Sequence, residues 1–118
     1  MVQTNYQLTS HHLYKSWFKE YQGCEVLEKD FGFMTYSFIN DACIIHDMFV
    51  VEEYRGNKGS AKLADEVAQI AKSQGCRRLI GFVHLGLETT DISLMCQLKY
   101  GFKVKMAENN KITLEKEI

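Results

Sequence analysis

The chain has 118 residues and a mass of 13.7 kDa, with 46% hydrophobic, 12% aromatic and 25% charged residues. This length supports one hydrophobic core, so we expect a single domain over residues 1–118, and the composition excludes a disordered or fibrous chain. Because 14 basic residues stand against 15 acidic ones, the formal charge of -1 leaves no bulk positive field for binding nucleic acid.

Signals for targeting and for metal binding are weak. The longest apolar runs, 42–45 and 48–51, have four residues each, whereas a membrane span needs about 20. The N-terminal segment is polar where a secretory signal requires an apolar stretch. Neither a C-x-x-C nor an H-E-x-x-H pattern occurs, so we expect no metal and no membrane partner, a cytoplasmic location, and four reduced, buried thiols: Cys24, Cys43, Cys76 and Cys96.

The first predicted helix covers residues 10–21 and carries apolar side chains at helical spacing. Thr9 or Ser10 can cap its first turn, and Gly23 follows its end. Its aromatic stripe is expected to face the core and consists of Tyr14, Trp17, Phe18 and Tyr21.

Three strands are predicted next. Residues 24–28 and 33–39 form a hairpin, and residues 42–51 are apolar at even and odd positions, which is typical of a buried central strand. The polar interruptions of this central strand, His46 and Asp47, are adjacent in sequence. We therefore expect them to point to opposite faces of the sheet.

The remaining elements alternate between helices and strands: helix 61–74, strand 78–84, helix 90–99, strand 102–106 and strand 111–117. In the second of these helices Thr89 or Thr90 can cap the first turn, and Ile92, Met95 and Leu98 recur at helical spacing. Helices that separate strands in this order predict an α/β fold with a sheet of mixed direction and helices packed on its faces.

The segment between the central strand and helix 61–74 has the features of an anion site. The N–H groups in the first turn of a helix are unpaired, and the helix dipole attracts negative charge. Arg55 and Lys58 add cationic donors, and the small residues beside them let a phosphate approach the backbone. A pyrophosphate fits this junction; the alternative is a plain strand-to-helix turn with a solvated arginine and lysine.

This junction resembles the acetyl-CoA signature of the GNAT superfamily of N-acetyltransferases, in which an apolar strand leads to Arg/Gln-x-x-Gly-x-Gly/Ala. Residues 48–50 correspond to the strand end, Arg55 begins the motif, and Ser60 occupies its final small position. A second similarity is the Tyr-Gly-Phe sequence of residues 100–102, which follows the last predicted helix as the family's Gly-Phe pair does. The resemblance covers residues 42–117.

The resemblance implies a GNAT-like fold with a splayed central strand pair, acetyl-CoA as the cofactor, and direct attack of a primary amine on the thioester. The amine belongs to a small molecule or a peptide, and a homodimer is a reasonable assembly. The resemblance also implies that a backbone N–H near Val50 or Val51 meets the thioester carbonyl. It assigns cofactor binding to Phe49, Val50, Val51, Arg55, Gly56, Asn57, Lys58, Gly59, Ser60, Ala61 and Thr90.

Three positions differ from the family pattern. Lys58 stands at the first motif glycine, Glu52 replaces the usual proline, and Gln97 stands where the family often has a tyrosine that protonates the departing thiolate. Because an amide does not donate a proton in this way, the alternative function is a catalytically inactive GNAT-like binding or interaction module.

Acetyl transfer to an amine needs a general base and a proton donor. His46 is the first choice for the base, since an imidazole exchanges a proton near neutral pH, and His84 is the second. Tyr100 and Cys96 lie close to Gln97 and are the choices for the donor, with solvent as the alternative. Each of these four side chains also has an ordinary explanation as a packed or hydrogen-bonded structural residue.

Overall fold

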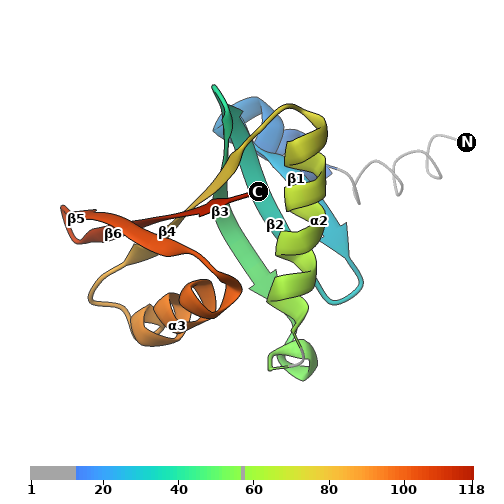
Figure 1. Ribbon diagram of the computed structural model, residues 1–118. Coiled ribbons are helices and arrows are strands. Elements are labelled where there is room, and N and C mark those ends of the chain that lie inside the picture. The colour runs from blue at the N-terminus through green and yellow to red at the C-terminus, as the bar shows by residue number, and fades with distance from the viewer. Residues whose placement is uncertain (1–12, 57) are drawn as a thin grey trace, which may run out of the picture.

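The computed structural model describes residues 13–56 and 58–118, and its elements follow the predicted order (Figure 1). An α-helical turn at 13–17 continues as the π-helix η1 (Phe18–Gln22). The remaining elements are β1 (Glu25–Lys29), β2 (Gly32–Ile39), β3 (Ala42–Val50), the 3-10 helix η2 (Glu52–Tyr54), α2 (Gly59–Ser73), β4 (Arg78–His84), α3 (Thr90–Tyr100), β5 (Lys103–Glu108) and β6 (Lys111–Glu117). The predicted α/β fold class is confirmed, while the proposed caps Thr9 and Ser10 lie outside the described residues.

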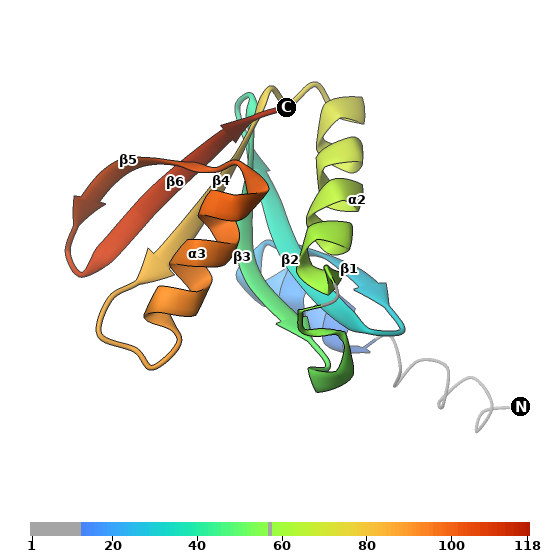
Figure 2. The same cartoon turned by 60° about the horizontal axis from the view of Figure 1, so that its bottom comes forward.

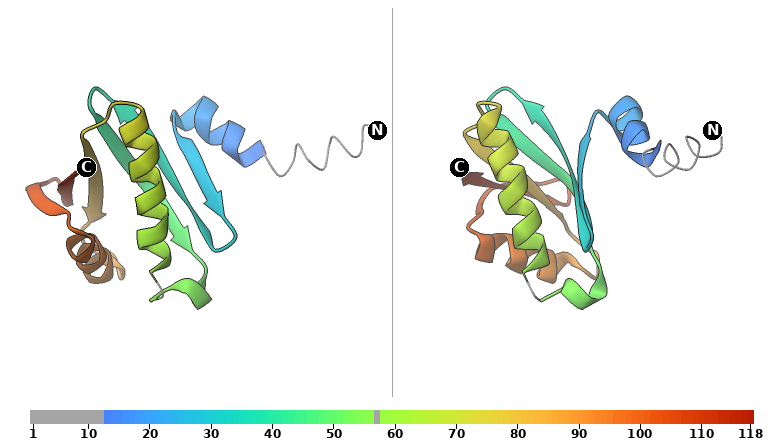
Figure 3. Two further views of the ribbon diagram at one scale, coloured as in Figure 1. Left: turned by 45° about the vertical axis from the view of Figure 1, so that its right-hand side comes forward. Right: turned by 90° about the vertical axis from the view of Figure 1, so that its right-hand side faces the viewer.

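The strands form one six-stranded sheet in the order β1-β2-β3-β4-β6-β5. Only β3 and β4 are parallel among the neighbouring pairs of described strands, and the chain crosses between them through α2. Figure 2 shows α2 and α3 side by side on one face of the sheet. The first helix lies against β1 on the opposite face (Figure 3).

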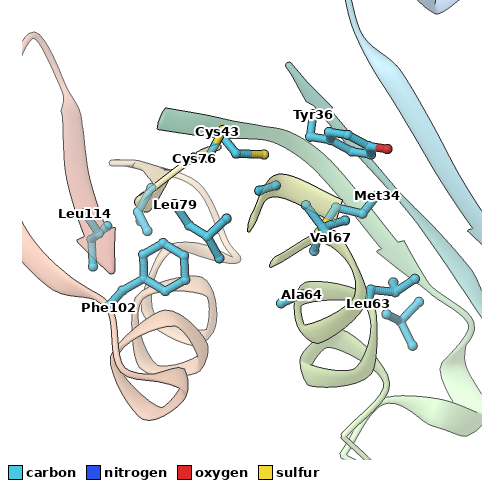
Figure 4. Close-up of a cluster of buried hydrophobic side chains, with 13 residues drawn as sticks. Met34, Tyr36, Cys43, Leu63, Ala64, Val67, Cys76, Leu79, Phe102 and Leu114 are labelled. Carbon is cyan, nitrogen blue, oxygen red and sulfur yellow. The ribbon is translucent and has the colours of Figure 1, made fainter. Parts of the chain in front are cut away.

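The core fills the space between α2 and the sheet. Leu63, Val67 and Ala71 recur at helical spacing on α2 and are fully buried, as the apolar face of this helix predicts. Figure 4 shows Met34 of β2 beside Val67 in this cluster. The cluster continues across the sheet with Tyr36, Cys43, Val50, Cys76, Leu79, Val83, Phe102 and Leu114.

The first helix is more exposed than predicted. Tyr14 and Phe18 are half-buried, and the Tyr14 ring packs edge-on against Phe33 of β2. Trp17 and Tyr21 are 49% and 72% exposed, so the expectation that the whole aromatic stripe faces the core is wrong for these two. The helix ends in a wider π turn, which breaks the regular spacing, and it covers only the edge of the sheet.

Helix α3 turns its predicted apolar side to solvent. Ile92, Met95 and Leu98, whose helical spacing helped to predict this helix, are 66%, 57% and 46% exposed. The helix instead faces the sheet with Leu94 and Gln97, because it packs mainly on one strand, β4.

Three of the four cysteines are buried as predicted, but Cys96 is exposed on α3, so burial of all four thiols is wrong. Burial and the neighbouring Cys76 raise the pKa of Cys43 to about 12, which keeps this thiol protonated. The described residues contain no cluster of three or more groups able to hold a metal ion. Within the same residues, no helix is long and apolar enough to cross a membrane.

Candidate functional site

The central parallel strands separate after a short paired stretch. β3 and β4 pair only from Ala42 with Arg78 to Ile44 with Ile80, and both strands then continue without pairing to each other. Figure 2 shows β3 and β4 diverging below this stretch. The predicted splayed central pair is confirmed, and the separation leaves an opening along which the backbone edges of β3 and β4 no longer pair with each other.

A β-bulge lies on β3 beside this opening. The pairing with β2 shifts register so that Thr35 faces Asp47 whereas Tyr36 faces Ile45, which makes His46 the extra residue. Thr35 Oγ1 donates to Asp47 Oδ2 at 3.0 Å.

The bulge changes the direction of the two polar side chains of β3. Ser37 Oγ and His46 Nε2 share a hydrogen bond of 2.7 Å, while Asp47 is bonded to Thr35. Because Thr35 and Ser37 are two residues apart on one strand, they lie on one face, and so do His46 and Asp47. The expectation that these two lie on opposite faces is wrong, since simple alternation fails at a bulge.

The end of β3 presents two backbone groups to the opening. The Val51 N–H donates to Phe31 O at 2.8 Å, so this N–H is already paired on the β2 side. By alternation the Phe49 backbone also faces β2, and the backbones of Met48 and Val50 face the opening. Val50, which the sequence singled out, therefore directs its backbone N–H at the opening. The backbone N–H of Met48 has the same direction.

The junction from β3 to α2 brings the N-terminus of α2 close to the end of β3. Gly59 begins the helix and is buried, and a Cβ at this position would lie 2.9 Å from Val50 Cγ1 and 3.1 Å from Tyr54 O. This close approach of α2 to the end of β3 leaves no room for a Cβ, which explains the glycine at position 59. Asn57, which the sequence also assigned to this loop, lies outside the described residues.

Lys58, the N-cap of α2, makes no side-chain cap hydrogen bond, and the first turn of the helix has no acidic residue. The Lys62 N–H donates to Lys58 O, so the N–H groups of Gly59, Ser60 and Ala61 precede the first bond of the helix. Unpaired N–H groups at the positive end of a helix dipole bind anions. The structure thus brings Gly59, Ser60 and Ala61 together at the mouth of the opening, as the sequence predicted for a phosphate site.

Two cations flank this helix N-terminus. Arg55 Nε donates to Val50 O at 2.8 Å, and its guanidinium lies 5.7 Å from the centre of the Phe49 ring. This arrangement fixes the exposed side chain at the end of β3. Lys58 is exposed and precedes the helix with a left-handed φ of 63°, a conformation that glycine adopts at lower cost.

The backbone of Lys58 leads to a stability prediction. Lys58→Gly should raise the free energy of unfolding by about 1 kcal/mol, because glycine has no Cβ to clash in the left-handed region. Lys58→Ala removes only the charge and keeps the Cβ, so it should change the free energy of unfolding by less than about 0.5 kcal/mol. Urea unfolding of the three proteins measures both values, and equal stability of the two variants would contradict the explanation.

The opposite side of the opening is covered by two side chains of α3. Gln97 Nε2 donates to Phe82 O at 3.0 Å, and Thr90 Oγ1 donates to His84 O at 2.7 Å. Thr90 Oγ1 also accepts from the Leu87 N–H at 3.0 Å, so its hydroxyl is bonded within the loop before α3. Sequence reasoning missed this arrangement, although the resemblance had matched both residues to motif positions of the family.

The two candidate proton donors lie on the side of α3 that faces α2. Tyr100 Oη donates to Asp65 Oδ1 of α2 at 2.7 Å. Burial and then this hydrogen bond raise the pKa of Tyr100 above its ordinary value, so its phenol is a weaker acid than a free tyrosine. Cys96 is one helical turn away on the same side and is exposed.

A hollow of about 540 Å³ lies on the face of the sheet away from α2 and α3. It begins at Ile44 and Ile80, the last residues that pair β3 with β4. Along β4, Phe82 and His84 line the hollow, whereas the alternate residue Val83 belongs to the core under the helices. The hollow also meets the β5–β6 hairpin at Met106, Glu108, Asn109, Lys111 and Thr113.

The comparisons with known proteins agree with this geometry. The model of the acetyltransferase (GNAT) family matches residues 2–95. The chain therefore belongs to the GNAT acetyltransferase family. No curated protein sequence matches it.

Solved structures share the fold at low sequence identity. PaiA N-acetyltransferase from Thermoplasma acidophilum, in complex with coenzyme A, is 23% identical with a TM-score of 0.67; the match covers 75% of this chain and 54% of that one. A GNAT family acetyltransferase from Elizabethkingia anophelis with acetyl-CoA bound is 17% identical with a TM-score of 0.67, covering 88% and 83% of the two chains. This chain thus spans about half the length of the Thermoplasma protein.

Proposed function

We propose that this chain binds acetyl-CoA and transfers its acetyl group to a primary amine by direct attack. The observation that carries the proposal is the opening between β3 and β4, which meets the uncapped N-terminus of α2 at its mouth. The coenzyme A and acetyl-CoA bound to two structural neighbours support this choice of cofactor. When bound, acetyl-CoA supplies an acetyl group activated as a thioester.

The residues present fit such a cofactor. The N–H groups of Ser60 and Ala61, with Gly59, suit the pyrophosphate, and Arg55 and Lys58 add charge-assisted donors. The backbones of Val50 and Met48 face the opening and can pair with the amides of an extended arm. An arm anchored at α2 and paired with Val50 and Met48 leads along β3 toward the bulge.

The hollow on the other face is the proposed entrance for the amine. Its apolar floor ends at the point where β3 and β4 separate, and its volume suits a small molecule or a peptide terminus. His84 lines the hollow itself, whereas His46 lies on the same face two residues beyond Ile44, close to the point where β3 and β4 separate, and is the proposed base. Tyr100, Cys96 or solvent then returns a proton to the leaving sulfur.

Binding of coenzyme A in a calorimetric titration tests the cofactor site. Arg55→Ala should weaken binding by about 1.5 to 3 kcal/mol, because the guanidinium loses charge-assisted contacts to phosphate. Arg77→Ala is the matched control, since this exposed arginine precedes β4 at the far end of α2, and it should bind as the wild type does. Absence of binding at millimolar coenzyme A would overturn the proposal.

The second candidate is a binding module without turnover, and Gln97 is the observation that favours it. Its amide is bonded to Phe82 O and cannot supply the proton that a tyrosine could. Release of free thiol from acetyl-CoA, measured across a panel of amines, separates the two functions. Steady release above the amine-free blank would exclude the inactive module.

A further inference from the structure

Two backbone carbonyls of β4 have unusual partners. Beyond Ile80 the strand no longer pairs with β3, yet Phe82 O and His84 O each accept a hydrogen bond from a side chain of α3. The donors are Gln97 and Thr90, which are two helical turns apart and therefore lie on one side of α3. Both side chains reach the same strand, and their acceptors are alternate residues of β4.

These carbonyls lie on the strand edge that β3 leaves. In a strand, the backbone groups of alternate residues project from the same edge, while those between them project from the other. β6 pairs with β4 along its whole length and covers the other edge. Gln97 and Thr90 thus take the place of the N–H groups that a fully paired β3 would supply to Phe82 and His84.

The fit of Gln97 against β4 is specific. A Cβ at Gly81 would overlap Gln97 Oε1 and would lie 3.3 Å from Phe102 Cε2, so only a glycine accommodates the amide here. Gln97 Oε1 itself is buried and has no hydrogen-bond partner within residues 13–56 and 58–118. A buried oxygen without a hydrogen-bond partner destabilises a protein. The position of the Gln97 side chain is therefore explained by the hydrogen bond that its N–H donates to Phe82 O, and not by its oxygen.

We infer that Gln97 and Thr90 are positioning residues that keep β4 apart from β3 before any ligand binds. Without these two side chains, the carbonyls of Phe82 and His84 would form hydrogen bonds with β3 or with water. The opening would then be formed in only a fraction of the molecules. A site that is formed only part of the time binds its ligand more weakly by that fraction. The inference depends on the proposed function only for the choice of coenzyme A as the probe.

The first test measures cofactor affinity in variants that remove one donor. Gln97→Leu and Thr90→Val should each raise the Kd for coenzyme A about fivefold to tenfold. In turnover, the KM for acetyl-CoA should rise with little change in kcat, which a general loss of stability would not produce. Thr90→Ser keeps the hydroxyl and should restore wild-type affinity, and Gln69→Leu on the exposed surface of α2 is the control for the glutamine change.

The second test needs no ligand. Amide hydrogen exchange can be followed residue by residue by NMR. The N–H groups of Phe82 and His84 lie on the same edge of β4 as their carbonyls, so their exchange should slow in both variants when β3 pairs with this edge. Exchange at Leu79, on the stretch where β3 and β4 already pair, should stay unchanged. Gly81→Ala should give the same pattern as Gln97→Leu, since the added methyl group displaces the amide. A Kd within twofold of wild type together with unchanged exchange at Phe82 and His84 would overturn the inference.

The two tests separate this inference from the proposed function. If the wild-type chain binds no coenzyme A, the proposed function fails, and the exchange pattern alone decides whether α3 keeps the strands apart. If Gln97→Leu does not fold, the comparison of Thr90→Val with Thr90→Ser decides it in the same way.

Discussion

Replacing His46 with glutamine should lower kcat/KM for acetyl transfer by about 100-fold or more, the usual effect of removing a general base. In the proposed function the arm of acetyl-CoA would pair with Val50 and Met48 and lead toward the bulge, at which His46 is the extra residue. Ser37 Oγ bonds to Nε2 of the imidazole at 2.7 Å, so Nδ1 is the ring nitrogen left to accept the proton of the amine. The measurement is kcat/KM for the amine, determined for the variant and the wild type at the same pH.

His84→Gln is the control for this prediction. His84 lines the hollow and His46 does not, but His84 lies at the end of β4, about 13 Å of strand beyond Ile80 where the opening begins. Its replacement should change kcat/KM by less than about tenfold. If His84→Gln lowers kcat/KM by about 100-fold while His46→Gln changes it by less than about tenfold, the roles of the two histidines are reversed.

The fold could be predicted where local patterns carry the information. The observed bounds of β4 and β6 equal the predicted ones, because short apolar or alternating runs are enclosed by turn residues such as Asn109 and Asn110, both with a positive φ. Helix α2 follows from its apolar stripe. Local patterns do not show which other elements pack against a helix, and for this reason they do not predict the exposed apolar face of α3.

The candidate site could be predicted only in part for the same reason. The anion-binding character of the α2 N-terminus follows from residue types alone, since small residues and cations stand at one strand-to-helix junction. The bulge at His46 has no residue signature and depends on how β2 pairs with β3. The role of Gln97 depends on where β4 leaves β3, and sequence spacing does not give that position.

Leu79→Ala should lower the free energy of unfolding by about 2 to 5 kcal/mol, the largest stability effect that we expect from one substitution in this chain. Leu79 is fully buried and lies on the short stretch where β3 and β4 still pair, opposite Cys43. Its side chain belongs to the core cluster that joins α2 to Phe102 and Leu114 on the other half of the sheet. Truncation therefore leaves a cavity at the point where the two halves meet.

Urea unfolding measures this loss, with Leu87→Ala as the control. Leu87 is 57% exposed in the loop before α3, so its replacement should change the free energy of unfolding by less than about 0.5 kcal/mol. A loss below about 1 kcal/mol for Leu79→Ala would mean that the halves of the sheet do not depend on this contact. Since β3 and β4 pair over only three residue pairs, the packing of Leu79 has to supply the cohesion that further backbone pairing provides in a continuous sheet.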